Sequence, residues 1–131
     1  MKDIKDIVTK FLNIEIEISR NKGPFTLFAL FLRDENNKWD LLVSSEWIDK
    51  EKYESLRYIV SNIQQTLTQE ELVEISGIEI IDNDNPALDA IYMDISTEHS
   101  IIEIANSNFF GVIISHAYII TSKRPVKKIL A

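Results

Sequence analysis

Apolar residues in the first part of the chain fit two periodicities at once. Helical spacing relates Ile4, Ile7, Val8, Phe11, Ile14 and Ile18. Strand-like alternation relates Leu12, Ile14, Ile16 and Ile18. The residues that follow are typical of a helix end, because Arg20 and Lys22 suit a last turn, Gly23 suits the cap and Pro24 stops continuation. We therefore predict a helix over residues 2–20, with strand as the open alternative for residues 12–19.

The next segment has the pattern of a hairpin. Both faces of residues 25–33 are apolar, which indicates a central strand covered on its two sides. Residues 34–38 are polar turn formers, and residues 39–45 alternate as the partner strand. Asp40 is the first residue off the apolar face after the turn, where a solvated carboxylate is usual. Nothing around it completes a catalytic group, so we interpret it as structural.

The second half begins with a helical pattern. Asp49 is predicted to cap it, and the apolar seam comprises Tyr53, Leu56, Val60, Ile63 and Leu67. Residues 68–71 then form a capping box, which starts a further helical turn.

Shorter elements follow toward the C-terminus. Residues 77–82 read GIEIID and predict a strand, and residues 86–93 predict a short helix that Asn85 caps. Two more strands are expected at residues 100–105 and 112–122, around a turn-rich segment at 106–111.

The order of these elements indicates the fold class. Strands come in neighbouring pairs with helices between the pairs, which is typical of α+β domains. A length of 131 residues with 45% hydrophobic residues suits one globular domain. We predict a single α+β domain over residues 1–122, with a mixed or mostly antiparallel sheet of about five strands and two main helices packed on it. Residues 123–131 are predicted to be a short basic tail.

Composition narrows the possible functions. The chain has no cysteine, which excludes disulfides, thiol nucleophiles and thiolate metal sites. No apolar run reaches the length of a membrane span, and the N-terminus lacks the pattern of a signal peptide. No glycine-rich phosphate loop is present. We therefore expect a cytoplasmic protein that has no membrane association and no cofactor.

Charge is unevenly distributed along the chain, whose net charge is -7. Residues 58–122 contain no lysine or arginine and ten acidic residues. Four basic residues lie in the tail: Lys123, Arg124, Lys127 and Lys128. The acidic part disfavours direct nucleic-acid binding and suits a basic protein partner, although acidity can also serve solubility alone. Alternatively, the tail pairs with the acidic part of a neighbouring copy, which would give a homo-oligomer.

Four polar residues inside apolar strands are the candidates for catalysis: Glu79, Glu103, His116 and Tyr118. If their strands are neighbours, two carboxylates and an imidazole would converge, and a Glu–His contact would orient a general base. The simpler interpretation makes each of them the outward residue of a half-exposed strand.

The segment DNDNP at residues 82–86 has the spacing of the first two ligands in a calcium loop, at Asp82 and Asp84. The rest of that motif fails, because Ala87 stands in place of the required glycine and Met93 in place of the bidentate glutamate. No metal site is predicted, and Asp82 and Asp84 stay the only candidates for a magnesium ion.

Two segments carry a resemblance to other proteins. The run GPFTLFALFLRDENNKWDLLVSSEWID, residues 23–49, resembles a signature of small bacterial proteins of uncharacterised function, and HAYIITS, residues 116–122, is similar as well. The resemblance implies no activity and no functional residue.

These observations favour a non-catalytic protein–protein interaction or accessory module. One alternative is a small enzyme or small-molecule binder that uses the Glu/His constellation. The other is an acidic nucleic-acid mimic that binds a basic protein.

Overall fold

The computed structural model describes residues 3–109 and 112–125. The helices are α1 (Ile4–Lys22), α2 (Glu46–Lys50), α3 (Lys52–Thr66), α4 (Gln69–Leu72) and α5 (Leu88–Asp94). The strands are β1 (Leu27–Arg33), β2 (Lys38–Ser44), β3 (Ile75–Ile80), β4 (Ile102–Phe109) and β5 (Val112–Ser122).

The strands form one five-stranded sheet in the order β3-β2-β1-β5-β4. Only the β2–β3 pair is parallel, and the other three pairs are antiparallel. The predicted single α+β domain with a mixed, mostly antiparallel sheet is therefore confirmed. As expected from its apolar faces, β1 is the central strand.

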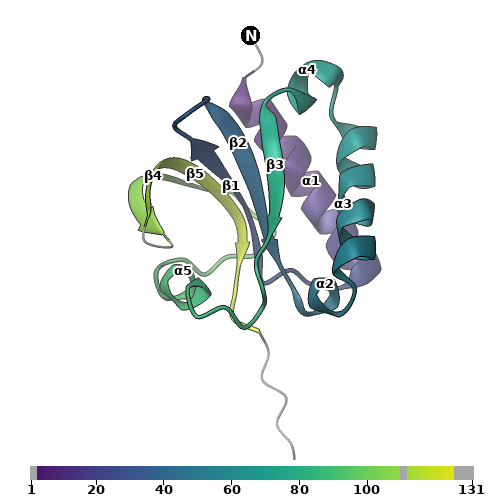
Figure 1. Cartoon of the computed structure of the whole chain (residues 1–131), viewed down its shortest axis with the longest axis vertical. Coiled ribbons are helices and arrows are strands. Elements are labelled where there is room, and N and C mark those ends of the chain that lie inside the picture. The colour runs from purple at the N-terminus through teal and green to yellow at the C-terminus, as the bar shows by residue number, and fades with distance from the viewer. Residues whose placement is uncertain (1–2, 110–111, 126–131) are drawn as a thin grey trace, which may run out of the picture.

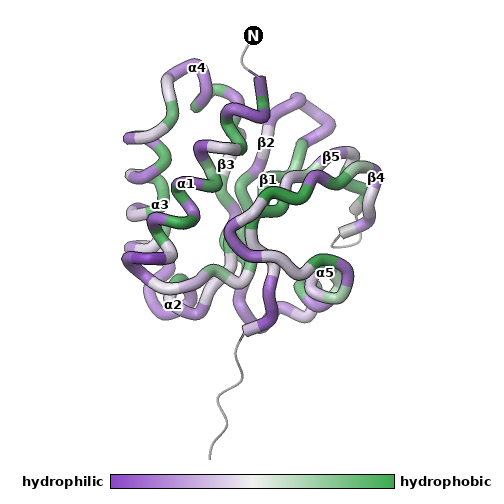
Figure 2. Tube along the Cα trace, turned by 180° about the vertical axis from the view of Figure 1, so that it is seen from behind, coloured by the Kyte–Doolittle hydropathy of each residue, from purple (hydrophilic) through white to green (hydrophobic). Residues whose placement is uncertain are grey.

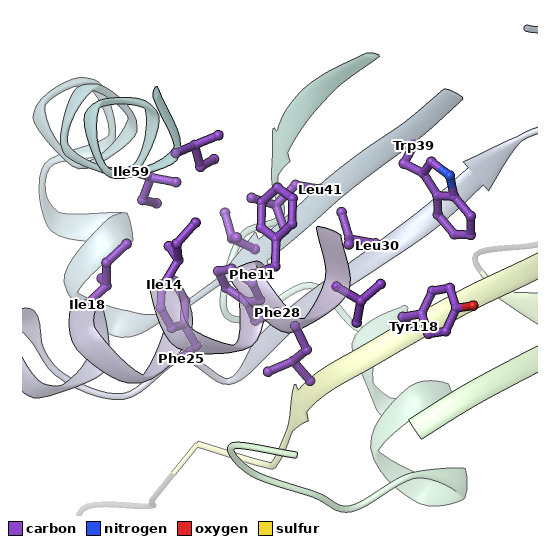
Figure 3. Packing of buried hydrophobic residues seen from close by; sticks show 14 of the residues in the cluster. Phe11, Ile14, Ile18, Phe25, Phe28, Leu30, Trp39, Leu41, Ile59 and Tyr118 are labelled. Carbon is purple, nitrogen blue, oxygen red and sulfur yellow. The ribbon is translucent and has the colours of Figure 1, made fainter. Parts of the chain in front are cut away.

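The sheet separates two apolar layers. Helices α1 and α3 cover one face, while α5 lies against the other beside the curled β4–β5 hairpin (Figure 1). Apolar residues of α1 and α3 pack on β1 and β2 in the larger cluster, where Phe11, Phe28 and Leu41 are fully buried (Figure 3). A smaller cluster lies under α5. Figure 2 shows the matching concentration of hydrophobic colour along β1 and β5.

The ambiguous N-terminal segment is a helix, as predicted. The Asp3 side chain accepts a hydrogen bond from the N–H of Lys5, and the chain leaves the helix at Gly23, whose φ is 125°. A helix places Ile7, Phe11 and Ile18 on one buried side, and this burial favours the helix over a strand. The capping box at Thr68 and Glu71 is also present.

For the middle helix, the predicted cap is wrong and the predicted apolar seam is only partly correct. Ser45 caps the five-residue helix α2, which the sequence analysis missed, and Asp49 lies inside that helix instead of capping the next one. The buried face of α3 holds Ser55, Ile59 and Ile63, whereas Tyr53 is 70% exposed. The predicted seam is therefore correct for Ile63 and Leu67, which are buried, and wrong for Tyr53, while it lacks the fully buried Ile59.

Boundaries near the C-terminal hairpin also differ from expectation. The strand predicted at 100–105 extends to Phe109, so most of the predicted turn is strand, and residues 110–111 lie outside the described residues. The Asn85 side chain accepts the N–H of Ala87, but helix α5 begins only at Leu88. Asn85 therefore forms a turn just before the helix and is not, as had been expected, its N-cap. Across the described residues, no helix combines the length and apolar character that crossing a bilayer requires.

Candidate functional site

Three of the four predicted catalytic candidates lie together on the outer part of the sheet. Glu103 of β4 and Tyr118 of β5 are direct cross-strand neighbours. The Nε2 atom of His116 lies 2.7 Å from Glu103 Oε2, and the Tyr118 hydroxyl donates to the same oxygen at 3.5 Å. The expected Glu–His contact therefore exists, and it joins β4 to β5.

Aromatic rings support this cluster from the side of the core. The Trp39 ring meets His116 edge-on at 5.5 Å between centroids, and it lies 5.5 Å from the Tyr118 ring (Figure 3). Burial of Tyr118, followed by the nearby negative charge of Glu103, raises the pKa of its hydroxyl. Tyr118 consequently stays a neutral hydrogen-bond donor at neutral pH.

Glu79, the fourth candidate, is not part of this cluster. It lies on β3 at the opposite edge of the sheet, with β2 and β1 between it and β5. It is in register with Leu42, which belongs to the layer under α5, whereas Tyr118 packs in the layer under α1. The prediction that two carboxylates and an imidazole converge is therefore wrong for Glu79.

Asp40 is also less exposed than its position after the turn suggested. Its side chain is 15% exposed and lies 3.8 Å from the Arg33 guanidinium. Burial is the main cause that raises the pKa of this carboxyl group, and Arg33 opposes the shift. The hairpin interpretation holds, but the carboxylate is mostly buried.

The Asp82 and Asp84 pair does not form a metal cluster. Asp82 pairs with Lys52. Between the two aspartates, the N–H of Asn83 donates to Asp49 Oδ2 at 2.9 Å, and Asn83 Oδ1 accepts from Thr26 at 2.6 Å. Among residues 3–109 and 112–125, no group of three or more ligating side chains could hold an ion. The segment connects the end of β3 to α2 and to Thr26, the residue just before β1.

A buried network that the sequence analysis missed connects α1 to the end of β5. The Glu15 side chain is fully buried, and its carboxylate lies 2.6 Å from Nδ1 of His99. Ser19 and Thr121 donate to its other oxygen. A signal existed in the sequence, because Glu15 is four residues after Phe11 and three before Ile18 on the apolar stripe.

The described part of the basic tail is paired within the same chain. Lys123 forms an ion pair with Glu98, and Arg124 lies 2.8 Å from Asp89. The acidic stretch is therefore a partner of the tail in this fold, which removes part of the reason to pair the tail with a second copy. Lys127 and Lys128 lie outside the described residues.

The Glu–His cluster borders an outer edge of the sheet. Strand β4 is outermost, and its eight residues, IEIANSNF, include neither lysine nor proline. Natural sheets commonly blunt such edges with those residues. The one charged side chain of β4, Glu103, is held by His116, and Asn106 with a φ of 52° is the local irregularity. Large apolar side chains are exposed close by, at Ile101 and Ile113.

Comparison of the chain with protein-family models, curated proteins and solved structures gave no match. The candidate site thus rests on the geometry of this chain alone. In that geometry the hydrogen bonds of Glu103, His116 and Tyr118 are directed at one another and join the outer strand β4 to β5.

Proposed function

We propose that the protein is a non-catalytic interaction module that receives an extended, basic segment of a protein partner along β4. The observation that carries the proposal is the long outer strand without protective lysine or proline. An added strand gains main-chain hydrogen bonds from such an edge, and alternating side chains supply specificity.

The charge pattern supports a basic partner over a second copy of the chain. Both outer strands, β3 and β4, come from residues 58–122, which contain no lysine or arginine. Each of these strands carries one glutamate and no basic residue, so two such edges meeting each other would bring like charges together, whereas a basic segment would be attracted to them. The proposal combines two expectations from the sequence: a protein–protein interaction module, and a basic protein as its partner.

The Glu103–His116 pair has a supporting role in this proposal. It ties β4 to β5 across the strand pair, with Trp39 packed against the imidazole. A strand held in this way is already extended before a partner arrives, so less ordering opposes binding.

A matched pair of substitutions at Ala105 tests the proposal. Ala105 is exposed on β4 opposite His116, so a longer side chain fits there. The probe is a fluorescent peptide of alternating lysine and threonine, followed by anisotropy at low salt. We expect Ala105→Lys to weaken binding roughly three- to tenfold and Ala105→Glu to preserve or strengthen it, since the two variants differ mainly in charge.

Salt and charge reversal supply the controls. Binding should weaken at physiological ionic strength, where the Debye length is about 8 Å, and a peptide of alternating glutamate and threonine should not bind. Equal affinity of the Lys and Glu variants for the basic peptide would contradict a docking site at β4.

A further inference from the structure

A cavity of about 310 Å³ is lined in part by residues of α2. Figure 1 shows α2 beside the end of α1. The cavity is formed by the end of α1, by α2, by the Asn83 loop and by the segment that follows β5. Its lining residues are Lys22, Gly23, Pro24, Thr26, Glu46, Trp47, Lys50, Asn83, Lys123, Arg124 and Pro125. Its volume falls at the lower end of the range for small-molecule sites, which is roughly 300–1,000 Å³.

The charge of this lining is opposite to that of the whole chain. The lining has four cationic side chains and one acidic residue, Glu46, which lies 3.7 Å from Lys50, although the protein has a net charge of -7. The cations come from three separate segments, because Lys22 ends α1, Lys50 ends α2, and Lys123 and Arg124 follow β5. The fold therefore collects positive charge that the sequence keeps apart.

These cations retain the capacity to bind an anion. Lys22 stacks on the Tyr58 ring at 4.7 Å and has no ion-pair partner in the described part of the chain. The carboxylates paired with Lys123 and Arg124, from Glu98 and Asp89, are not part of the cavity lining. A lysine carries three N–H donors and an arginine five, so one ion pair leaves further donors for a ligand.

One wall of the cavity is a fixed aromatic ring. The Trp47 Nε1–H donates to the Gly23 carbonyl at 3.0 Å, and the Trp47 ring meets Phe25 edge-on at 5.4 Å. The Gly23 backbone approaches so closely that an added Cβ would lie 3.3 Å from Trp47 Cδ1. The indole is thus held by the backbone and the core, which suits the planar or apolar part of a ligand.

We propose that this cavity binds a small organic phosphomonoester, with the phosphate among the four cations and an apolar or aromatic body against Trp47. A phosphate dianion offers several acceptor oxygens, which suits cations that converge from three segments. The site is separate from the β4 edge, so this proposal does not depend on the proposed function.

The test is a titration of the full chain with phenyl phosphate, followed by the NMR signal of the Trp47 indole N–H. We expect a saturable shift of this signal in the wild type. In Lys22→Ala and in Arg124→Ala the affinity should be at least about fivefold lower, because each substitution removes a charged donor. Lys5→Ala is the matched control, since Lys5 is an exposed lysine at the other end of α1. Its affinity should equal that of the wild type.

Two comparison ligands separate the parts of the proposal. Inorganic phosphate should bind more weakly than phenyl phosphate, and benzyl alcohol, which lacks the charge, should leave the Trp47 signal in place. The proposal is overturned if phenyl phosphate causes no saturable shift, if benzyl alcohol shifts the signal equally, or if the cavity variants bind like Lys5→Ala. If inorganic phosphate binds as tightly as phenyl phosphate, the claim that an apolar or aromatic group of the ligand contacts Trp47 is contradicted. Unchanged signals elsewhere in the variant spectra verify that the fold is intact.

Discussion

The Nδ1 atom of His99 lies 2.6 Å from Oε1 of Glu15, although the two residues are 84 positions apart in the chain. Glu15 is fully buried on α1, and His99, in the left-handed region with a φ of 56°, precedes β4. The N–H of His99 also donates to the Thr121 hydroxyl, which itself donates to Glu15. The contact therefore fastens the segment before the outer strand to the first helix.

This relationship predicts strong coupling between Glu15 and His99. Glu15→Gln and His99→Asn each remove one partner while keeping a polar group, and asparagine tolerates the left-handed backbone at position 99. We expect each to reduce the free energy of unfolding, with a coupling energy of about 1–3 kcal/mol in the double-variant cycle. Urea denaturation gives the free energy of unfolding of the wild type, the two single variants and the double variant. Additive losses would show that the contact contributes nothing specific.

A second buried carboxylate predicts acid sensitivity. Lys10 Nζ lies 2.6 Å from Glu71 Oε1. The hydrogen bond from Lys10, followed by that from the Thr68 N–H, lowers the pKa of Glu71 from 4.5 to about 2. A pKa lower in the folded than in the unfolded state adds stability above the unfolded pKa, and this stability is lost as pH falls from 4.5 toward 2.

Replacement of Glu71 tests that sign. Glu71→Gln removes the titration, so its stability should fall less steeply than that of the wild type over the same pH interval. We expect the difference between the two proteins to shrink by about 2 kcal/mol as Glu71 becomes protonated. Urea denaturation at successive pH values provides the comparison. Parallel curves would contradict the assignment.

At the end of α1, replacing Gly23 with alanine is expected to destabilise the protein. Gly23→Ala places a Cβ 3.3 Å from Trp47 Cδ1 on a backbone whose φ is 125°, so we expect destabilisation of about 1–2 kcal/mol. Gly77→Ala is the control, because its nearest contact, Asp40 Oδ1, is at 3.9 Å. Thermal unfolding compares them, and equal losses in the two variants would contradict the account.

The sequence predicted those features that depend on residues close in the chain. The capping box at Thr68 and the cap at Gly23 were correct because each needs only a few neighbouring residues. The Glu103–His116 contact was also predictable, since their strands form a hairpin.

Features that depend on strand order were not predictable. Glu79 belongs to a strand that pairs with β2 at the far edge, and no local pattern specified that position. The same reason explains Glu15 and His99, because their partnership exists only once α1 has packed beside β5. The cationic cavity likewise needs Lys22 and Lys123 brought together by the completed sheet.

Hydrogen exchange of the β4 backbone amides, measured by NMR with and without the lysine–threonine peptide, shows whether an extended basic segment pairs with this strand. In the free protein, every second amide between Ile102 and Asn108 faces outward and should exchange fast. If the peptide docks on β4, these amides gain protection when it is added and lose it again in Ala105→Lys. Protection that stays unchanged on β4, or that appears on α3 instead, would contradict docking at this edge.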